Sequence, residues 1–372
     1  LRGLQFLGTI SFRDPLRPGV RQAISEVEAA GIRVVIVTGD HAGPAVAVAA
    51  ALGLVVTPAQ ILSGEAVEKM TIRELMKQLP AIRIISRISP LGKLNIVRAY
   101  QALGETVAMT GDGINDAPAL KQANIGVAMG SGTDVSKDVA NLVLLDDNFE
   151  TIVEAIKEGR RIIQNIRKGI VYLTSTILNE IVLIGGSLLL GVPLPINPLQ
   201  ILWVNFFTDS FPGVSLAFES KIDTLGSKPA SLTKGIFTGQ MKFLITINGA
   251  ISSFLLLGLY IWLLNMGHDP AVVRTFIFAA FSTYSLFLVF AVRSLRRSIF
   301  EYNPLSNGYL VASVLFGFIL TLAAIAAPAL QDLFATVSLP AGWLFGVVGF
   351  GFLNILLVEF TKLIFRKKTV EA

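Results

Sequence analysis

The 372-residue sequence contains no cysteine, and charged residues make up only 15% of it. Without cysteine there can be no disulfide framework, thiolate metal site or thiol nucleophile. Soluble domains carry about a quarter charged residues, so this shortage of charge indicates that part of the chain lies in a membrane. The net charge of +5 does not predict a nucleic-acid partner, because no basic patch interleaves with aromatic residues.

The apolar residues are unevenly distributed along the chain. Residues 1–165 are mixed in character, whereas 166–365 are dominated by Leu, Ile, Val, Phe and Ala. This predicts a soluble domain, a membrane domain and a short cytosolic tail at 366–372. The sequence starts at Leu1 without a signal peptide, in the strand-like stretch "LQFLGTISF", and is interpreted as starting inside a domain of a longer protein.

Short apolar runs alternate with helical patterns in the soluble part. The helices 17–31 and 91–104 are amphipathic and are expected to end at Gly31 and Gly104. Strands that alternate with helices predict a doubly wound, mostly parallel, Rossmann-like α/β sheet. The runs predicted to be buried strands are 6–12, 32–40, 82–89, 106–113, 124–130 and 141–145.

The stretch "GDGIND" places Asp112 and Asp116 four residues apart, with Asn115 and two glycines beside them. It follows a predicted strand, and ligands of such sheets bind at the carboxyl ends of strands. Two converging carboxylates suit a hard cation such as magnesium, which often bridges to phosphate. The alternative is that Asp116 caps the helix that opens at "APALKQA", with Pro118 in its first turn.

Two further features point to phosphate. In "VTGDHAGPA", Thr38 and the amide of Gly39 can hold phosphate oxygens at a helix amino terminus; the alternative is an ordinary turn with Asp40 as the cap. His41 is interpreted as a surface residue. Lys93, early in the second helix, can stabilise charge on a transferring phosphoryl group, or it can be a solvated lysine.

Four stretches together resemble the phosphorylation domain of the P-type cation-transporting ATPases, within the haloacid-dehalogenase-like superfamily. The string "GDGINDAPAL" is highly specific for that family, and the others support it. The stretches are "DPLRPGV", "AGIRVVIVTGD", "MTGDGINDAPALKQANIGVAMGSGTDVSK" and "LVLLDDNFETIVEAIKEGRRI".

The resemblance implies a role for each matching residue. Asp112 would hold magnesium and Asn115 would hydrogen-bond the phosphoryl group, while Asp116 would orient Lys93 to stabilise an aspartyl phosphate. The remaining expected positions are the phosphate turn of Thr38 and Gly39, supported by Asp40, and the hinge to the ATP-binding domain formed by Asp14, Pro15 and Arg17.

The family's nucleophilic aspartate lies in a DKTG-type motif, and this string does not occur in the 372 residues. The resemblance therefore implies the carboxyl-terminal part of a pump, lacking the first strand of its phosphorylation domain. Its expected partner is the missing amino-terminal part, and its cofactors are Mg²⁺ and ATP. Without the nucleophile this chain alone is expected to be inactive.

A spanning helix needs roughly 20 apolar residues. Basic residues gather in the loops on one side, and the opposite loops offer only Arg274. This asymmetry predicts a cytosolic soluble domain and carboxyl terminus, and the plasma membrane is the expected location. The six predicted spans are 168–190, 197–218, 241–264, 271–292, 308–328 and 341–364.

Oxygen-bearing side chains occur inside the first two predicted spans. Glu180 lies in the first, and Asn205, Thr208 and Asp209 share a helical face in the second. Pro212 is expected to loosen that helix. Acidic groups at this depth are functional hypotheses by default, and these four suit a hard cation. The alternative is an interhelical hydrogen-bond network.

Six helices after the phosphorylation domain resemble the type II pumps, so the interpretation is a calcium pump that spans the lipid bilayer. Ile177 stands where two-site calcium pumps carry asparagine, and 271–292 lacks their glutamate, which predicts one cation site. The alternatives are a sodium, potassium or proton pump, a non-catalytic partner subunit and a membrane-tethered phosphatase. Glu359, beside Lys362, is expected to be structural.

Overall fold

The computed structural model describes residues 8, 10, 15–219 and 236–370, without the side chains of 365–370. The chain forms two compact units, which meet between Glu158 and Gly159 and are described separately. The strand predicted at 6–12, most of the 218–240 loop and Asp14 lie outside the described residues.

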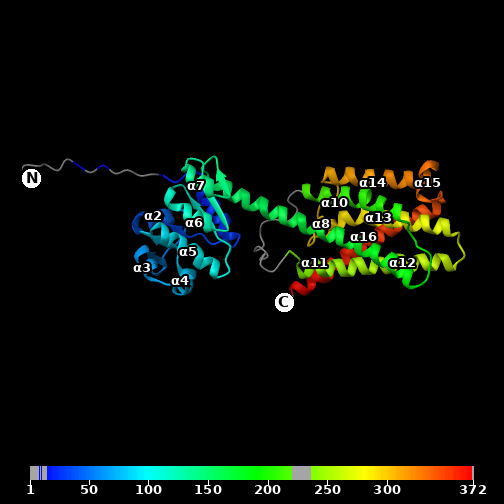
Figure 1. Cartoon of the computed structure of the whole chain (residues 1–372), viewed down its shortest axis with the longest axis horizontal. Coiled ribbons are helices and arrows are strands. Elements are labelled where there is room, and N and C mark those ends of the chain that lie inside the picture. Colours follow the sequence, from blue (N-terminus) through cyan, green and yellow to red (C-terminus); the bar gives the residue numbers. More distant parts are fainter. Residues whose placement is uncertain (1–7, 9, 11–14, 220–235, 371–372) are drawn as a thin grey trace, which may run out of the picture. The chain divides into compact units, whose positions relative to one another are not determined.

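The first unit is an α/β domain with two parallel three-stranded sheets. One has the order β1-β3-β2 and the other β4-β5-β6. The strands are β1 (Ile36–Val37), β2 (Ile61–Ser63), β3 (Ile84–Ser86), β4 (Ala108–Gly111), β5 (Ile125–Met129) and β6 (Leu142–Leu144). The helices around them (Figure 1) are α1 (Val20–Ala29), α2 (Ala42–Ala51), α3 (Gly64–Lys69), α4 (Ile72–Gln78), α5 (Pro90–Ala102), α6 (Ala117–Gln122) and α7 (Asp134–Val139), with the 3₁₀ turns η1 (Pro58–Gln60), η2 (Leu79–Ala81) and η3 (Ile114–Asp116).

The parallel α/β class predicted from the sequence is confirmed. Each of the five predicted strands in the described part contains a strand, although each is shorter than its apolar run. Gly31 and Gly104 both have positive φ, +78° and +83°, just past the ends of α1 and α5, as expected for glycine there. Within the described residues the strands form two ladders, with β1 and β4 at their edges.

Helix α5 joins the cores of the two sheets. Ile96 and Ala99 are buried against the first sheet with Ile85 of β3, while Val97 packs with Ala119 of α6. Because α5 is fixed from both sides, its first turn has a defined place next to the loop after β4. That turn carries Lys93.

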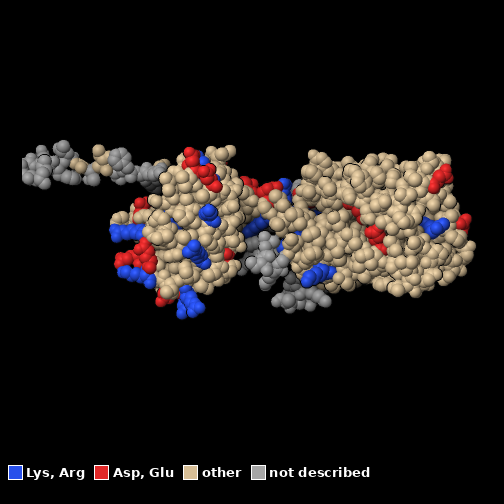
Figure 2. All heavy atoms as spheres, viewed as in Figure 1, with Lys and Arg blue, Asp and Glu red and all other residues tan. Residues whose placement is uncertain are grey.

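The second unit is helical. Among the described residues, five helices are long and apolar enough to cross a membrane: 149–189, 239–265, 270–292, 308–326 and 341–364. Charged residues are scattered over the visible surface of the α/β unit but are rare on that of the helical unit (Figure 2). The elements are α8 (Phe149–Leu189), α11 (Gly239–Leu244), η7 (Ile245–Gly249), α12 (Ala250–Asn265), α13 (Pro270–Val292), η8 (Ile299–Glu301), α14 (Gly308–Ala326), α15 (Pro328–Phe334) and α16 (Ala341–Val370).

The predicted span 197–218 is helical but not uniform. It consists of α9 (Pro198–Trp203), the π-helix η4 (Val204–Ser210), α10 (Phe211–Ser215) and the 3₁₀ turn η5 (Leu216–Phe218). We call this stretch, residues 198–218, the interrupted helix. None of its pieces is long enough to span a membrane alone, so the sixth span stays a prediction.

Candidate functional site

Lys93 and Asp116 form an ion pair in the α/β unit. Ser89 caps α5 by accepting a hydrogen bond from Gly92 N at 3.1 Å, which starts the helix one turn before Lys93. Lys93 Nζ donates to Asp116 Oδ1 at 2.5 Å, and the two side chains are only 14% and 11% exposed. The solvated-lysine alternative is therefore wrong.

Asp116 starts α6 but does not cap it with its side chain, so the capping alternative is also wrong. The carboxylate turns to Lys93 instead. Gly111 makes room for it, because a Cβ on Gly111 would lie 2.8 Å from Asp116 Oδ2. The glycine before Asp112 is thus needed for close packing of the second aspartate.

Asp112 is held through its backbone. Its carbonyl accepts hydrogen bonds from Thr133 N and from Ser136 Oγ, both at 2.9 Å. The side chains of Asp112 and Asn115 are exposed. Thr133 and Ser136 were not predicted from the sequence. The feature that could have indicated them is Thr133 as the capping residue of α7.

The turn after β1 is pinned to the end of β3. Thr38 N donates to Ile85 O at 2.9 Å and Arg87 N donates to Asp40 O at 2.9 Å, while Asp40 N donates to Thr38 Oγ1 at 3.1 Å. The capping residue of α2 is His41, without a side-chain cap, so Asp40 as the cap is wrong.

Arg87 is a further residue at this edge that the sequence did not single out. It has a positive φ of 54°, which is unusual outside glycine and often marks functional sites. Its Nη2 lies 2.8 Å from His41 Nδ1, and both side chains are exposed. His41 is thus a surface residue, as expected.

The acidic residues of the α/β unit could bind magnesium only together with ligands that the protein does not supply. In the described part of the chain, no three His, Cys, Asp or Glu side chains gather into a group that could hold a metal ion. Magnesium is usually bound through one or two carboxylates together with substrate phosphate oxygens and water. The single exposed carboxylate of Asp112 fits that pattern, and a cage made of protein alone does not.

Of the expected hinge, Pro15 and Arg17 lie in the described part of the chain, and Arg17 makes a side-chain contact there. Its Nη1 donates to Asp146 O at 3.1 Å, which ties the chain before α1 to the loop after β6. In the loop after β6, Asp147 Oδ1 accepts a hydrogen bond at 3.0 Å from the amide of Ser131, which follows β5, and this bond lowers the pKa of the Asp147 carboxyl.

Two of the four residues of the predicted cation site meet directly in the helical unit. Asn205 Nδ2 donates to Glu180 Oε1 at 3.2 Å, linking η4 to α8. Thr208 is fully buried, but its hydroxyl donates to Val204 O of its own helix at 2.9 Å. Asp209 is 3% exposed, and its Oδ1 has no hydrogen-bond partner among the described residues. The Asn205–Glu180 bond joins two helices, so part of the structural alternative holds as well.

Asp209 lies where the helix is least regular. Pro212 has no N–H, so the carbonyl of Thr208, four residues earlier, loses its helical partner. Tyr172 OH of α8 donates to that carbonyl at 2.9 Å, and the tyrosine is fully buried. The π-helix η4 ends at Ser210, just before Pro212, and such widened turns often occur at functional sites.

Hydroxyl groups of two other helices flank Asp209. Thr176 of α8 and Ser285 of α13 lie close to its carboxylate. Ser285 is fully buried, and its Oγ has no hydrogen-bond partner in the described structure. No sequence pattern marked Ser285, since one serine in an apolar helix is usually a packing residue.

Glu359 and Lys362 form a buried pair on α16 at 2.7 Å. Lys362 Nζ also donates to Ala291 O, near the end of α13, at 2.6 Å. These contacts agree with the structural role expected for Glu359.

Comparison with known proteins gives two family matches. The family described as "Cation transporting ATPase, C-terminus" matches residues 193–364, and "haloacid dehalogenase-like hydrolase" matches residues 2–124. The "Calcium-transporting ATPase" of Bacillus subtilis is 40% identical over 371 residues, which cover 99% of this chain and 41% of that protein. Over nearly its whole length the chain is thus similar to part of a cation-transporting ATPase.

Other relatives within the cation-transporting ATPases extend this result. "Calcium-transporting ATPase 1" of Lactococcus lactis is 36% identical over 94% of this chain and 39% of that protein. Human "Calcium-transporting ATPase type 2C member 1" is 36% identical over 90% of this chain and 37% of that protein. The chain thus spans about two fifths of the length of the curated relatives it matches. Its long apolar helices, together with these relatives, show that it is an integral membrane protein.

Proposed function

We propose that this chain is the carboxyl-terminal part of an ATP-driven, type II calcium pump. Residues 1–165 would form its phosphorylation domain, 166–365 its transport domain with six spans, and 366–372 a cytosolic tail. The observation that carries the proposal is the set of buried oxygens at Asp209. Carboxylates from two helices, Asp209 and Glu180, lie in apolar surroundings beside neutral oxygens, which is the ligand chemistry of a hard cation.

The phosphate chemistry is proposed for the edge formed by the loops after β1 and β4. Lys93 would stabilise charge on the transferring phosphoryl group, and the short bond from Asp116 would keep its ammonium in place. Asn115 would donate to a phosphoryl oxygen. The Thr38 hydroxyl and Gly39 amide would bind phosphate oxygens in a turn that Asp40 holds to β3.

Asp112 would hold magnesium. When bound, magnesium neutralises charge on phosphate oxygens. The hydrogen bonds from Thr133 and Ser136 to the Asp112 carbonyl leave the carboxylate exposed for that role.

The phosphoryl acceptor is proposed to be an aspartate outside these 372 residues. The strand carrying it would fit between β1 and β4, which are edge strands of their sheets in the described part of the chain. The intact protein would include an ATP-binding domain beyond the hinge of Asp14 and Arg17. The soluble unit would face the cytosol, and the membrane would be the plasma membrane.

The test is phosphoenzyme formation by the full-length gene product in proteoliposomes. Radiolabelled phosphate from ATP is expected in an acid-stable protein adduct only when calcium is present, together with calcium uptake into the vesicles. Absence of an adduct at every cation tested, or a reading frame upstream of Leu1 without a DKTG motif, would overturn the proposal in favour of a non-catalytic subunit.

A monovalent cation or proton is the second candidate. The observation that favours it is Ser285, a neutral hydroxyl where α13 flanks Asp209, since fewer charged ligands weaken binding of a divalent cation. The same vesicles, supplied with sodium, potassium or a pH step in place of calcium, distinguish the two candidates.

A further inference from the structure

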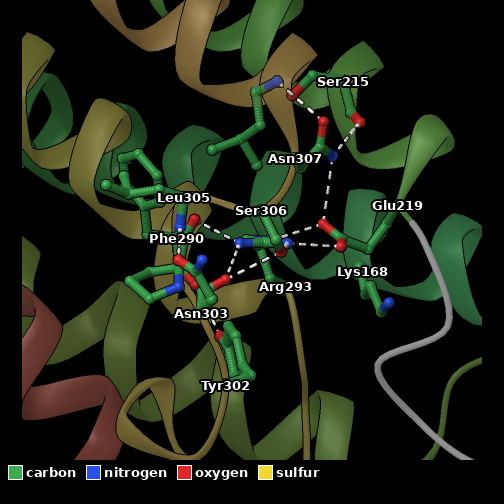
Figure 3. Close-up of polar contacts among 12 residues, drawn as sticks. Lys168, Ser215, Glu219, Phe290, Arg293, Tyr302, Asn303, Leu305, Ser306 and Asn307 are labelled. Atoms are coloured by element: carbon green, nitrogen blue, oxygen red, sulfur yellow. Dashed lines mark hydrogen bonds and ion pairs between the residues drawn. The ribbon is translucent and has the colours of Figure 1, made fainter.

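A buried ion pair closes the end of the interrupted helix. Glu219 directly follows η5, and both of its carboxylate oxygens accept from Arg293, with Nε–Oε2 and Nη2–Oε1 distances of 2.7 Å. Both side chains are fully buried. Figure 3 shows the two groups facing each other as a fork, the strongest geometry for such a pair.

Arg293 uses all five of its N–H groups. Besides the two bonds to Glu219, Nη1 donates to the carbonyls of Asn303 and Pro304, and Nη2 donates to Ser306 Oγ at 2.8 Å. The guanidinium therefore joins three places: the end of α13, the loop before α14 and the end of the interrupted helix. No rotation of the side chain would keep this set of bonds.

The last carbonyls of the interrupted helix are also satisfied from outside. A helix leaves its final carbonyls without partners of its own. Asn307 Nδ2, at the start of α14, donates to Ser215 O at 3.1 Å. Asn165 Nδ2 of α8 donates to Ala217 O and Glu219 O at 3.2 Å each. Side chains of α8, of the end of α13 and of the start of α14 thus form hydrogen bonds with the end of this helix.

We infer that the Arg293–Glu219 pair is a positioning device for the cation site. It fixes the register of the interrupted helix against α13, and so the place of Asp209 relative to Glu180 and Ser285. The inference rests on the proposed cation transport. The interrupted helix needs such an anchor, because the π-helix and Pro212 weaken its own hydrogen bonding next to Asp209.

The charge of the pair supports positioning rather than stability. A buried ion pair can often be replaced by apolar residues of similar volume without loss of stability, whereas removal of one partner is strongly destabilising. Apolar residues cannot supply the directional geometry of a bidentate arginine–carboxylate pair. Arg293 and Glu219 therefore act by positioning Asp209 and do not contact the cation.

The experiment compares Glu219→Gln with wild type in the full-length protein. The cation concentration for half-maximal phosphorylation by ATP is expected to rise about tenfold, equivalent to roughly 1.4 kcal/mol. The maximal phosphoenzyme per folded molecule, and phosphorylation by inorganic phosphate without the cation, are expected to stay within about twofold, because the phosphate site is untouched.

Glu359→Gln is the matched control. It also breaks a buried carboxylate–cation pair at 2.7 Å, with side chains 7% and 2% exposed, but this pair lies on α16. It is expected to lower the melting temperature and leave the half-maximal cation concentration unchanged. The double variant Glu219→Leu, Arg293→Met is expected to regain melting temperature but not cation affinity.

A register measurement keeps the inference testable if no phosphoenzyme forms at all. A Cβ on Gly213 would lie 3.5 Å from Leu173 Cδ2, so cysteines at these two positions, as the only pair present, report how α8 meets the interrupted helix. Glu219→Gln is expected to slow disulfide formation between these cysteines by about fivefold or more, whereas Glu359→Gln is expected to leave the rate unchanged. An unchanged rate would overturn the inference, as would recovery of cation affinity in the double variant.

Discussion

Two buried aspartates, one in each unit, are treated in opposite ways. Asp116 is 7% exposed and has the ammonium of Lys93 at 2.5 Å. Asp209 is 3% exposed, and one of its oxygens has no hydrogen-bond partner among the residues described. Burial of a carboxylate is costly unless the group is paired. The first aspartate is neutralised by the protein itself, whereas the second has bonding capacity for a cation from outside.

The local backbone explains why the two differ. Asp116 lies in a tight turn after a strand, and α5 is packed by both cores, so a lysine can be held rigidly across from it. Asp209 lies on a π-helix near Pro212, flanked by hydroxyls of Thr176 and Ser285, and no ion pair to it is found among the described residues. A fixed charge pair suits a site that binds phosphate repeatedly, and an open carboxylate suits an ion that must enter and leave.

The largest effect is expected from Asp209→Asn. The amide keeps the size of the side chain and removes the charge that the cation would neutralise, so cation-dependent phosphorylation by ATP is expected to fall by about 100-fold or more. Phosphorylation by inorganic phosphate without the cation should persist. The measurement is phosphoenzyme formation across a cation titration of the full-length protein.

Asp332→Asn is the control, because Asp332 is an exposed acid in the short helix α15. It should titrate like wild type. Normal cation dependence in Asp209→Asn would contradict the site assignment and remove the contrast with Asp116.

Lys93→Met is expected to act on the other half of the comparison. Loss of a group that stabilises transition-state charge typically costs about 10²–10³-fold in rate, so phosphoenzyme formation at saturating cation should fall by that factor. The half-maximal cation concentration should not move. Lys69→Met, which removes an exposed ammonium paired with Glu65, is the control, and a similar loss in both variants would count against a role for Lys93.

The sequence named candidate residues for both sites but did not predict their geometry. The strands and the "GDGIND" turn were readable because apolar runs and glycines leave strong local patterns. Thr133, Ser136 and Arg87 were not predicted, because their part in the site depends on which loops the sheets bring together. In the membrane unit, α-helical spacing placed Asn205, Thr208 and Asp209 on one face, but the structure widens that turn.

The missed features of the membrane unit have a common cause. Ser285, Tyr172 and Arg293 matter through contacts with segments more than 30 positions away, as in the bond between Tyr172 and Thr208. No local pattern marks such residues. The division into two sheets was also beyond prediction, because apolar runs indicate strands but not which of them pair.

Tyr172→Phe tests the Pro212 explanation of the Asp209 environment. The substitution keeps the ring and removes the hydroxyl that donates to Thr208 O, leaving a buried carbonyl without a partner, which costs about 1–3 kcal/mol. The half-maximal cation concentration is expected to rise roughly threefold to tenfold. Restoration of wild-type cation affinity by Pro212→Ala, which returns the helical N–H to that carbonyl, would support the explanation, and failure to restore it would argue that the hydroxyl acts in another way.

The smallest effect is expected at Glu28, an acidic residue outside both sites that is paired with an arginine. Arg83 lies 2.7 Å from Glu28, and each side chain is 26% exposed. Burial raises the pKa of Glu28, but the hydrogen bonds from Arg83 and from the Val34 amide outweigh it, so its pKa lies below the ordinary 4.5. A lowered folded-state pKa means that the pair stabilises the protein above about pH 4.5 and that this stabilisation is lost as the pH falls through the folded pKa. Glu28→Gln is therefore expected to cost about 1 kcal/mol or less at pH 7, with the difference from wild type shrinking in acid. Thermal unfolding of the full-length protein across pH measures this, with Glu65→Gln as an exposed-pair control. A difference that stayed constant into acid would show that Glu28 acts through packing, and the contrast between paired and unpaired carboxylates would then not extend to Glu28.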